Sequence, residues 1–187
     1  NLTTTSSGSK IVLWSDTDNN GGSSYILLND NVSLSSNNGD IYLGGGLDAN
    51  SDGLPDGYAL NTANNIYGGV NIGPKAGTGV GVSINSSGGD IVIKGKTGTS
   101  NSNPGVTSQA GFVINSGTGA ITIDGQSTTG HGTEFTFGTV AQVAITSAKT
   151  SGTAIDITGV TSVSGYQGLW LTNSTGNVLI QATGGGA

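Results

Sequence analysis

The sequence predicts an all-β protein folded as a parallel β-helix (β-solenoid), with short strands and turns of variable length. Two observations lead to this prediction: a twelve-residue pattern recurs, and pairs of apolar residues two positions apart occur along the whole chain. Four stretches, 32–43, 82–93, 112–123 and 169–180, align without a gap. Self-similarity of this kind is typical of architectures in which one structural unit stacks on the next.

Each copy of the pattern reads apolar-x-apolar, then a polar stretch with glycine at its eighth position, then apolar-x-apolar again. The glycines at this position are Gly39, Gly89, Gly119 and Gly176. Glycine is favoured where the chain adopts a positive φ or where no Cβ fits. We therefore expect a corner at this glycine, with the two apolar pairs on successive sides of one coil.

The apolar pairs predict strands because alternate residues of a strand lie on one face. They are close together along the chain, so we expect strands of about three to five residues. No window keeps apolar residues at helical spacing for more than one turn, and glycines interrupt every candidate. The one Asn-Gly pair, Asn38-Gly39, falls inside the repeat, which argues against a hairpin protein.

Two imperfect copies, 2–13 and 143–157, extend the repeat. Taking the second apolar pair as a marker, the copies are separated by 30, 50, 30, 34 and 23 residues and begin at Ile11, Ile41, Ile91, Ile121, Ile155 and Val178. These spacings suit coils with three faces, and six to eight coils would form a rod of roughly 30–40 Å at about 4.8 Å per coil. The 50-residue interval holds either one coil plus an insertion or two coils, the second supplied by Val70 and Ile72.

The composition limits the function classes. Charged residues make up 9% of the 187 residues, there are 35 glycines, and cysteine is absent, which excludes a disulfide framework. The net charge of −6, with five lysines and no arginine, argues against nucleic acid as a partner. No apolar run approaches the roughly 20 residues that span a bilayer, and no signal peptide is visible. We expect a single β-helix domain over 1–187, cut from a longer exported protein.

One motif carries specific chemistry, and it lies in a predicted inserted loop at 47–65. The stretch 48–57 reads DANSDGLPDG, which matches D-x-[DN]-x-[DN]-G-x-x-D. It resembles the acidic half of an EF-hand loop and the calcium loops of bacterial adhesins and thrombospondin type 3 repeats. Ca²⁺ takes six to eight oxygen ligands. The expected ligands are the side chains of Asp48, Asn50, Asp52 and Asp56 and the carbonyl of Leu54.

The twelfth position of an EF-hand loop supplies a bidentate acidic ligand, and here it is Ala59. Water or another coil would have to complete the shell, and the alternative interpretation is a polar turn that holds no ion. A second acidic stretch, 16–21 (DTDNNG), matches the first six loop positions but has no acidic residue after them. We interpret it as an ordinary turn.

The stretch 7–46 resembles the repeats of filamentous haemagglutinin-like proteins, which are large bacterial exoproteins and adhesins exported by two-partner secretion. The resemblance lies in the opening KIVLWSD, the Asp/Asn/Gly turn after it and the closing NGDIYLGGG. Weaker copies extend it over most of the chain. The resemblance implies a right-handed parallel β-helix that is secreted or displayed on the bacterial surface, where it serves adhesion or acts as a stalk.

Catalysis is disfavoured by the distribution of acid–base groups. The single histidine, His131, lies between two glycines and is expected to be a solvated loop residue. Asp40 and Asp90 share one repeat position and so one face of the rod, but the other two copies have Ala120 and Asn177 there, which indicates a turn position. Tyr42 and Trp170 should point outward, where aromatic rings could stack on sugars or contact a neighbouring chain.

The sequence therefore predicts a structural and adhesive β-helical segment, not an enzyme, with one structural Ca²⁺. Its expected partners are neighbouring coils or identical chains end to end, and cell-surface glycans or matrix. An alternative is a β-helical carbohydrate-active enzyme or carbohydrate-binding domain, which a cleft with two or more carboxylates and several aromatic rings would favour. A third possibility is a self-assembling filament subunit.

Overall fold

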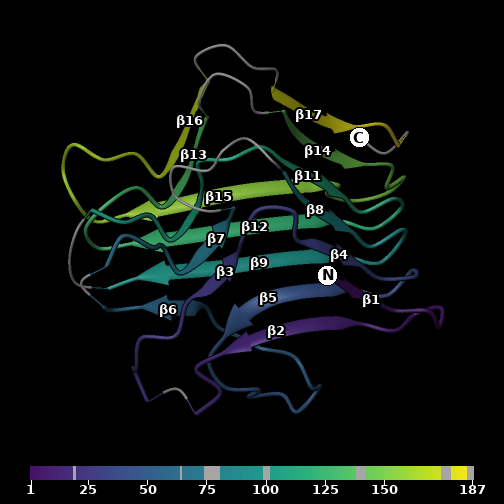
Figure 1. Ribbon diagram of the computed structural model, residues 1–187, viewed down its shortest axis with the longest axis horizontal. Coiled ribbons are helices and arrows are strands. Elements are labelled where there is room, and N and C mark those ends of the chain that lie inside the picture. The colour runs from purple at the N-terminus through teal and green to yellow at the C-terminus, as the bar shows by residue number, and fades with distance from the viewer. Residues whose placement is uncertain are drawn as a thin grey trace.

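The computed structural model describes residues 1–18, 20–63, 65–73, 81–98, 102–137, 142–173 and 178–184. Within these ranges the protein consists of strands and turns arranged in three parallel sheets (Figure 1). None of the described segments is a helix long and apolar enough to cross a membrane. The predicted all-β parallel β-solenoid is confirmed.

Each sheet is a stack of strands contributed by successive coils. Sheet A contains β1 (Leu2–Thr3), β4 (Ser33–Ser35), β8 (Val82–Asn85), β11 (Phe112–Asn115), β14 (Val143–Ser147) and β17 (Val178–Ala182). Sheet B contains β2 (Ile11–Ser15), β5 (Ile41–Gly45), β9 (Ile91–Thr97), β12 (Ile121–Ser127) and β15 (Ile155–Thr161). Sheet C contains β3 (Ile26–Leu28), β7 (Val70–Ile72), β10 (Val106–Ser108), β13 (Thr133–Phe137) and β16 (Leu169–Asn173).

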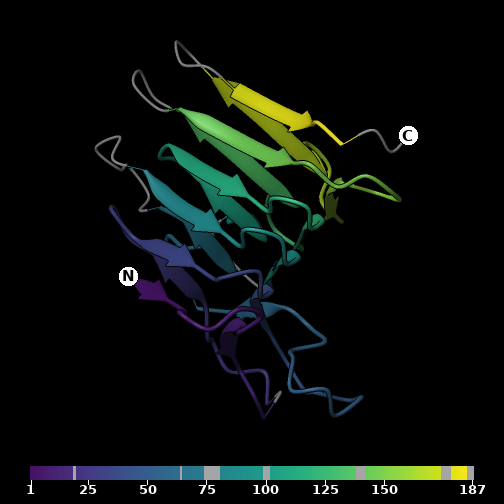
Figure 2. The same cartoon turned by 90° about the vertical axis from the view of Figure 1, so that its right-hand side faces the viewer.

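The chain visits sheets A, B and C in turn, so three strands complete one coil. Five coils are complete, and β17 begins a sixth, which Figure 2 shows as a stack from the N-terminal to the C-terminal end. The prediction of six to eight coils was therefore too high. Six stacked strands at about 4.8 Å span roughly 24 Å, which is shorter than the expected rod.

One correction concerns where the repeat lies. The second apolar pairs from Ile11 to Ile155 all lie in register in sheet B, as predicted, but Val178 lies in sheet A beside Val143. The copy at 169–180 therefore runs from sheet C to sheet A, because apolar-x-apolar pairs look alike on every side of the coil. Its turn, 174–177, lies outside the described residues.

The core consists of columns of identical or similar apolar side chains. Ile41, Ile91 and Ile121 are fully buried on the inner face of sheet B, each stacked on the next. Phe112 from sheet A meets Phe135 from sheet C edge-on, with ring centroids 5.0 Å apart. Burying a side chain of this size contributes about 1.5–3 kcal/mol, so the columns are the main source of stability.

The strands of sheet B are longer than expected. Three of them, β9, β12 and β15, have seven residues, and their inward positions continue past the isoleucines as a glycine and then a threonine or serine. In β12 these residues are Gly125 and Ser127, both buried. A Cβ on Gly125 would lie 2.2 Å from the carbonyl oxygen of Gly132, so the interior is too narrow there for an apolar side chain. The missing apolar residues hid these strand ends from the pattern.

The predicted corner glycines are required because the corners of successive coils stack in close contact. A Cβ on Gly39, Gly89 or Gly119 would lie 2.0–2.3 Å from a backbone atom of the previous coil. None of the three has a positive φ; those angles fall on residues just before them, such as Asn38 (61°) and Ser87 (60°). The fourth glycine, Gly176, lies outside the described residues.

The 50-residue interval between Ile41 and Ile91 contains one coil plus an insertion. Val70 and Ile72 belong to sheet C of that same coil and supply no additional one. Strand β5 pairs with the first part of β9, and β6 (Ala59–Asn61) pairs with the last part, at Gly95–Thr97. The segment between these pairings projects from the middle of sheet B, opposite Lys94.

The two ends of the solenoid differ. In the first coil the inward side chains of Ile11 and Leu28 are 6% and 4% exposed, and of its inward residues Leu2, in β1, is 47% exposed. In the last coil Leu171 and Ile180 are 39% and 41% exposed. The C-terminal end therefore presents an uncovered apolar core together with unpaired strand edges.

Candidate functional site

The insertion is held against the outer face of the rod at its base. Gly45 and Gly57 exchange two backbone hydrogen bonds of 3.3 and 2.9 Å, which close the neck of the loop. The indole N–H of Trp14, from the first coil, donates to the carbonyl oxygen of Gly46 at 2.7 Å. The ammonium group of Lys94, from the third coil, donates to the carbonyl oxygen of Asp56 at 3.2 Å.

Tyr58 ties the end of the insertion to a more distant coil. Its hydroxyl donates to the carboxylate of Asp124 and accepts from the amide of Gln126, both at 2.5 Å. Asp124 and Gln126 lie on β12, two coils beyond β5. Burial, and then the hydrogen bond to Asp124 and its charge, raise the pKa of Tyr58 to about 12. The sequence analysis missed this anchor because nothing in the pattern indicates where the loop folds back.

Inside the loop, the predicted ligand side chains come together. The carboxylate of Asp48 accepts the N–H groups of Asp52 and Gly53, at 3.0 and 2.8 Å. The amide of Asn50 donates to Asp52 at 3.2 Å and to Asp56 at 3.4 Å. Residues at loop positions 1, 3, 5 and 9 are therefore near neighbours, as a calcium loop requires.

The remaining parts of the loop agree in part with an EF-hand-like fold. Gly53 has a φ of 79°, the left-handed conformation in which glycine is favoured for a tight turn. The side chain of Leu54 is 8% exposed, and it fixes the loop on the rod while its carbonyl is the expected ligand. Ala59 lies in β6 with 0% exposure, so the twelfth position cannot supply a ligand.

The donor set suits a hard cation, because it is made of carboxylate, amide and carbonyl oxygens. As the loop lies here, those oxygens accept hydrogen bonds from the loop's own N–H groups. Among the described residues there is no group of three His, Cys, Asp or Glu side chains arranged to hold a metal ion. The oxygens of Asp48, Asp52 and Asp56 would have to turn toward one point to bind Ca²⁺.

The second acidic stretch, 16–21, forms a turn. Asp16 has a φ of 53°, and the amide of Asn20 donates to Asp18 at 2.8 Å. Asn19 lies outside the described residues. The described part of this stretch is an exposed turn on the connection between sheets B and C.

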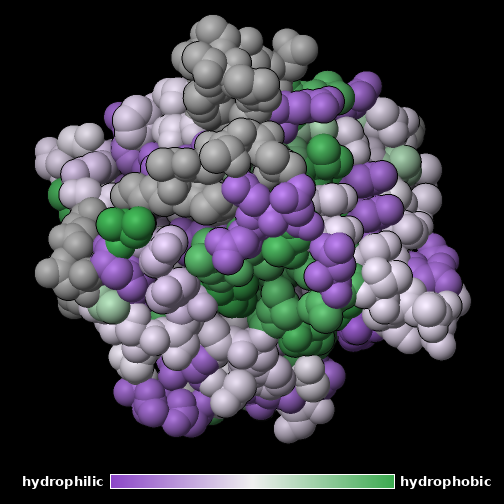
Figure 3. Space-filling model, in the orientation of Figure 1, coloured by the Kyte–Doolittle hydropathy of each residue, from purple (hydrophilic) through white to green (hydrophobic). Residues whose placement is uncertain are grey.

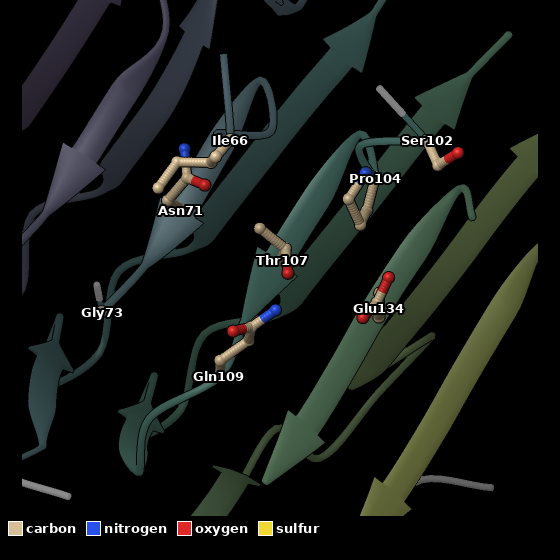
Figure 4. Close-up of a pocket in the computed structure, with 8 residues that line it drawn as sticks. All are labelled: Ile66, Asn71, Gly73, Ser102, Pro104, Thr107, Gln109 and Glu134. Carbon is tan, nitrogen blue, oxygen red and sulfur yellow. The ribbon is translucent and has the colours of Figure 1, made fainter. Parts of the chain in front are cut away.

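A separate feature lies on the outer face of sheet C. A groove of about 190 Å³ crosses the middle strands of this sheet. Figure 4 shows the side chains around it, and its lining residues are Ile66, Asn71, Gly73, Ser102, Pro104, Thr107, Gln109 and Glu134. Asn71, Thr107 and Glu134 are aligned across three neighbouring strands. They are the middle residues of inward-facing pairs, but the pairs Val106/Ser108 and Thr133/Phe135 each contain a polar residue, so the apolar-x-apolar pattern did not mark this row.

His131 is not the solvated loop residue that we expected. It is 3% exposed, and its ring packs against those of Tyr166 and Trp170, with centroids 5.0 and 4.0 Å away. Its Nδ1 accepts the backbone N–H of Gln167 at 3.0 Å. The expectation was wrong because the loops of two successive coils stack and cover the imidazole. Trp170 does face outward, with 38% exposure.

Asp40 and Asp90 are stacked, and their carboxylates have a structural role. Asp40 accepts the backbone N–H of Asp90 at 2.9 Å, and Asp90 accepts that of Ala120 at 2.8 Å. Lys10 pairs with Asp40 at 3.5 Å. The pKa of the neighbouring Tyr42 is raised by burial and then by the charges of Asp40, Asp90 and Asp52. Each aspartate thus links one corner to the next, as the turn interpretation implies.

The surface of the rod is not uniformly polar. On the face drawn in Figure 3, hydrophobic residues gather near the centre and hydrophilic ones border them. Among the described residues that line it, the groove on sheet C has one carboxylate, that of Glu134. A hydrolase that uses paired carboxylates needs two on one cleft.

The chain matches no protein-family model, no curated protein and no solved structure.

Proposed function

We propose that this chain is a structural and adhesive segment of a bacterial surface or secreted adhesin-like protein, and not an enzyme. In this role the β-solenoid is a rigid stalk, and the insertion holds a structural Ca²⁺. The observation that best supports the proposal is the position of the insertion. It contacts the first, third and fourth coils through Trp14, Lys94 and Tyr58. An ion that orders this loop would therefore stiffen most of the rod.

The ligands would be the side-chain oxygens of Asp48, Asn50, Asp52 and Asp56 and the carbonyl of Leu54. Ca²⁺ would replace the N–H groups that these oxygens now accept, and water would complete the six to eight ligands that the ion takes. The proximity of Lys94 to Asp56 opposes cation binding there. Together with Ala59 at position twelve, this favours an affinity in the range of extracellular modules, about 10⁻⁴–10⁻³ M.

Thermal unfolding followed by circular dichroism, with excess Ca²⁺ and then with a chelator, tests the proposal. A folded-state ion present at 100 times its dissociation constant adds about 2.7 kcal/mol. For a chain of this size that raises the melting temperature by roughly 5–11 °C, at about 2–4 °C per kcal/mol. Asp52→Asn should remove the effect, whereas Asp156→Asn, on the outer face of sheet B, should retain it. Equal melting temperatures in Ca²⁺ and chelator would refute the calcium site.

The adhesive role is tested by attachment. Beads coated with the folded chain should adhere to surfaces that carry glycans or extracellular matrix, and beads coated with heat-denatured chain should not. Equal attachment of both kinds of bead would count against an adhesive role. The chelation experiment would be unaffected, because it reports on the rod itself.

A further inference from the structure

We propose that the groove on the outer face of sheet C binds a single sugar residue. Its lining provides hydroxyl, amide and carboxylate groups together with apolar contacts, and its row of Asn71, Thr107 and Glu134 is built into the sheet. This inference names a ligand class for the proposed adhesive rod. Its biological role therefore rests on the proposed function, whereas the binding of a sugar does not. It places recognition on sheet C, away from the insertion on sheet B.

The strongest indication of a ligand is an unsatisfied hydroxyl. Thr107 is 8% exposed, and its Oγ1 is buried without a hydrogen-bond partner. The methyl group of Thr107 lies toward Gly68, where a Cβ would be 3.2 Å from Cγ2. The hydroxyl points, in the view of Figure 4, to the side of the groove where Gln109 lies. A buried polar atom without a partner is costly, and a ligand hydroxyl would satisfy it.

The neighbouring groups restrict the chemistry of that ligand. The carboxylate of Glu134 accepts hydrogen bonds, and the amide of Gln109 both donates and accepts. None of the described lining residues is a lysine or arginine, and the carboxylate of Glu134 disfavours an anionic ligand. A purely apolar ligand would leave Thr107 unpaired. A neutral molecule with several hydroxyl groups meets each of these conditions.

Size and shape favour a single sugar ring over a longer chain held along its length. The groove volume of about 190 Å³ is below the roughly 300–1,000 Å³ of sites for drug-sized ligands. Ile66 is 53% exposed at one edge and offers an apolar surface for the C–H face of a sugar. At the other edge Trp170 is paired in register with Glu134 on the adjacent strand. Trp170 does not line the groove, but it is 38% exposed one strand away, so its fluorescence can respond to a ligand at Glu134.

The test is a titration of the folded chain with methyl glycosides of glucose, mannose, galactose and N-acetylglucosamine. Binding is read by saturation-transfer NMR and by the fluorescence of Trp170, with Trp170→Phe identifying its signal against that of Trp14. A ligand of this size that makes few contacts should bind with a dissociation constant on the order of millimolar. At least one glycoside should saturate.

Two variants and two matched controls locate the site. Thr107→Val keeps the shape of the side chain and removes the hydroxyl, and Glu134→Gln removes the charge. Each should weaken binding by roughly tenfold, the effect of one lost hydrogen bond. Thr158→Val and Asp156→Asn, on the outer face of sheet B, should leave the affinity unchanged. Thr107→Val should melt at or above the temperature of the parent chain, because it removes an unpaired hydroxyl.

Two results would overturn the inference. The first is the absence of saturation by every glycoside. The second is glycoside binding that Thr107→Val and Glu134→Gln leave unchanged. Neither result bears on the calcium experiment, so failure of the sugar site and failure of the proposed stalk can be told apart.

Discussion

The corner of the coil offers the sharpest test of how this fold is maintained, through the substitution Gly119→Ala. A Cβ at this position would lie 2.0 Å from the carbonyl oxygen of Gly89 and 2.4 Å from its carbonyl carbon, whereas real Cβ contacts shorter than 3.0 Å essentially never occur. The obstacle is backbone of the previous coil and cannot rotate away. The two corners would therefore have to separate by at least 1 Å, the difference between 3.0 and 2.0 Å.

Separating the two corners would also lengthen the hydrogen bonds that join them. Two hydrogen bonds cross from the corner at Gly89 to the corner at Gly119: the hydroxyl of Ser86 donates to the carbonyl oxygen of Ser116 at 3.2 Å, and the backbone N–H of Ala120 donates to the carboxylate of Asp90 at 2.8 Å. Overpacking costs about 1–3 kcal/mol, and loss of two such hydrogen bonds adds about 1 kcal/mol each. The lower entropy of the unfolded alanine chain offsets about 0.4–1 kcal/mol. The net loss is about 2–5 kcal/mol, which lowers the melting temperature by roughly 4–20 °C at about 2–4 °C per kcal/mol.

Urea unfolding followed by circular dichroism measures this loss. Gly98→Ala is the matched control, because among the described residues a Cβ there meets the side chains of Thr62, at 3.2 Å, and Leu60, at 4.0 Å, and no backbone. We expect that control to stay within about 0.5 kcal/mol of the parent chain. If Gly119→Ala and Gly98→Ala unfold at the same urea concentration, close corner stacking is not what requires glycine in the repeat.

Two further predictions concern the insertion and the open end. Tyr58 has a folded-state pKa near 12, above its ordinary value of about 10, so its contribution to stability is complete below pH 10 and is lost as pH rises through 12. In Tyr58→Phe the free energy of unfolding should decrease less between about pH 10 and 12 than in the parent chain, and proteolysis within 46–57 should be faster. An unchanged pH profile would show that Tyr58 is not an anchor. At the C-terminal end, where Leu171 and Ile180 are 39% and 41% exposed, we expect self-association that Leu171→Lys and Ile180→Lys reduce. Sedimentation velocity checks this, and a parent chain that stays monomeric at high concentration would contradict it.

The fold was predictable because its determinants are local and repeated. The inward pairs at Ile41, Ile91 and Ile121 recur at the same place in each coil, and the corner glycines recur with them. What the pattern could not determine is the side of the coil on which a pair lies, and Val178 was misplaced for that reason. Apolar-x-apolar pairs form the inner face of all three sheets, so only the order of the coils distinguishes them.

The candidate sites were predictable to different degrees. The acidic motif at 48–56 can be recognised from its spacing alone, since its residues are consecutive along the chain. The anchor between Tyr58 and Asp124 joins residues 66 positions apart, and His131 is covered by a loop that begins more than thirty residues later. Such contacts depend on how far each turn extends over its neighbours, and turn length varies from coil to coil.

Some positions in the coil are constrained by packing and others are not, and this difference explains where both candidate sites lie. Inward residues are constrained by stacking, and a corner glycine such as Gly119 by the backbone of the previous coil. The middle residue of each apolar pair and the turns remain free to change without loss of the core. The groove is built on such middle positions, because Thr107 and Glu134 each lie between two inward-facing residues of a strand in sheet C. The insertion replaces a turn. β5 and β6 together occupy the position of one strand in sheet B, and the chain between them projects outward. A solenoid can thus acquire a metal loop on one face and a ligand groove on another independently, and variants in one should leave the other unchanged.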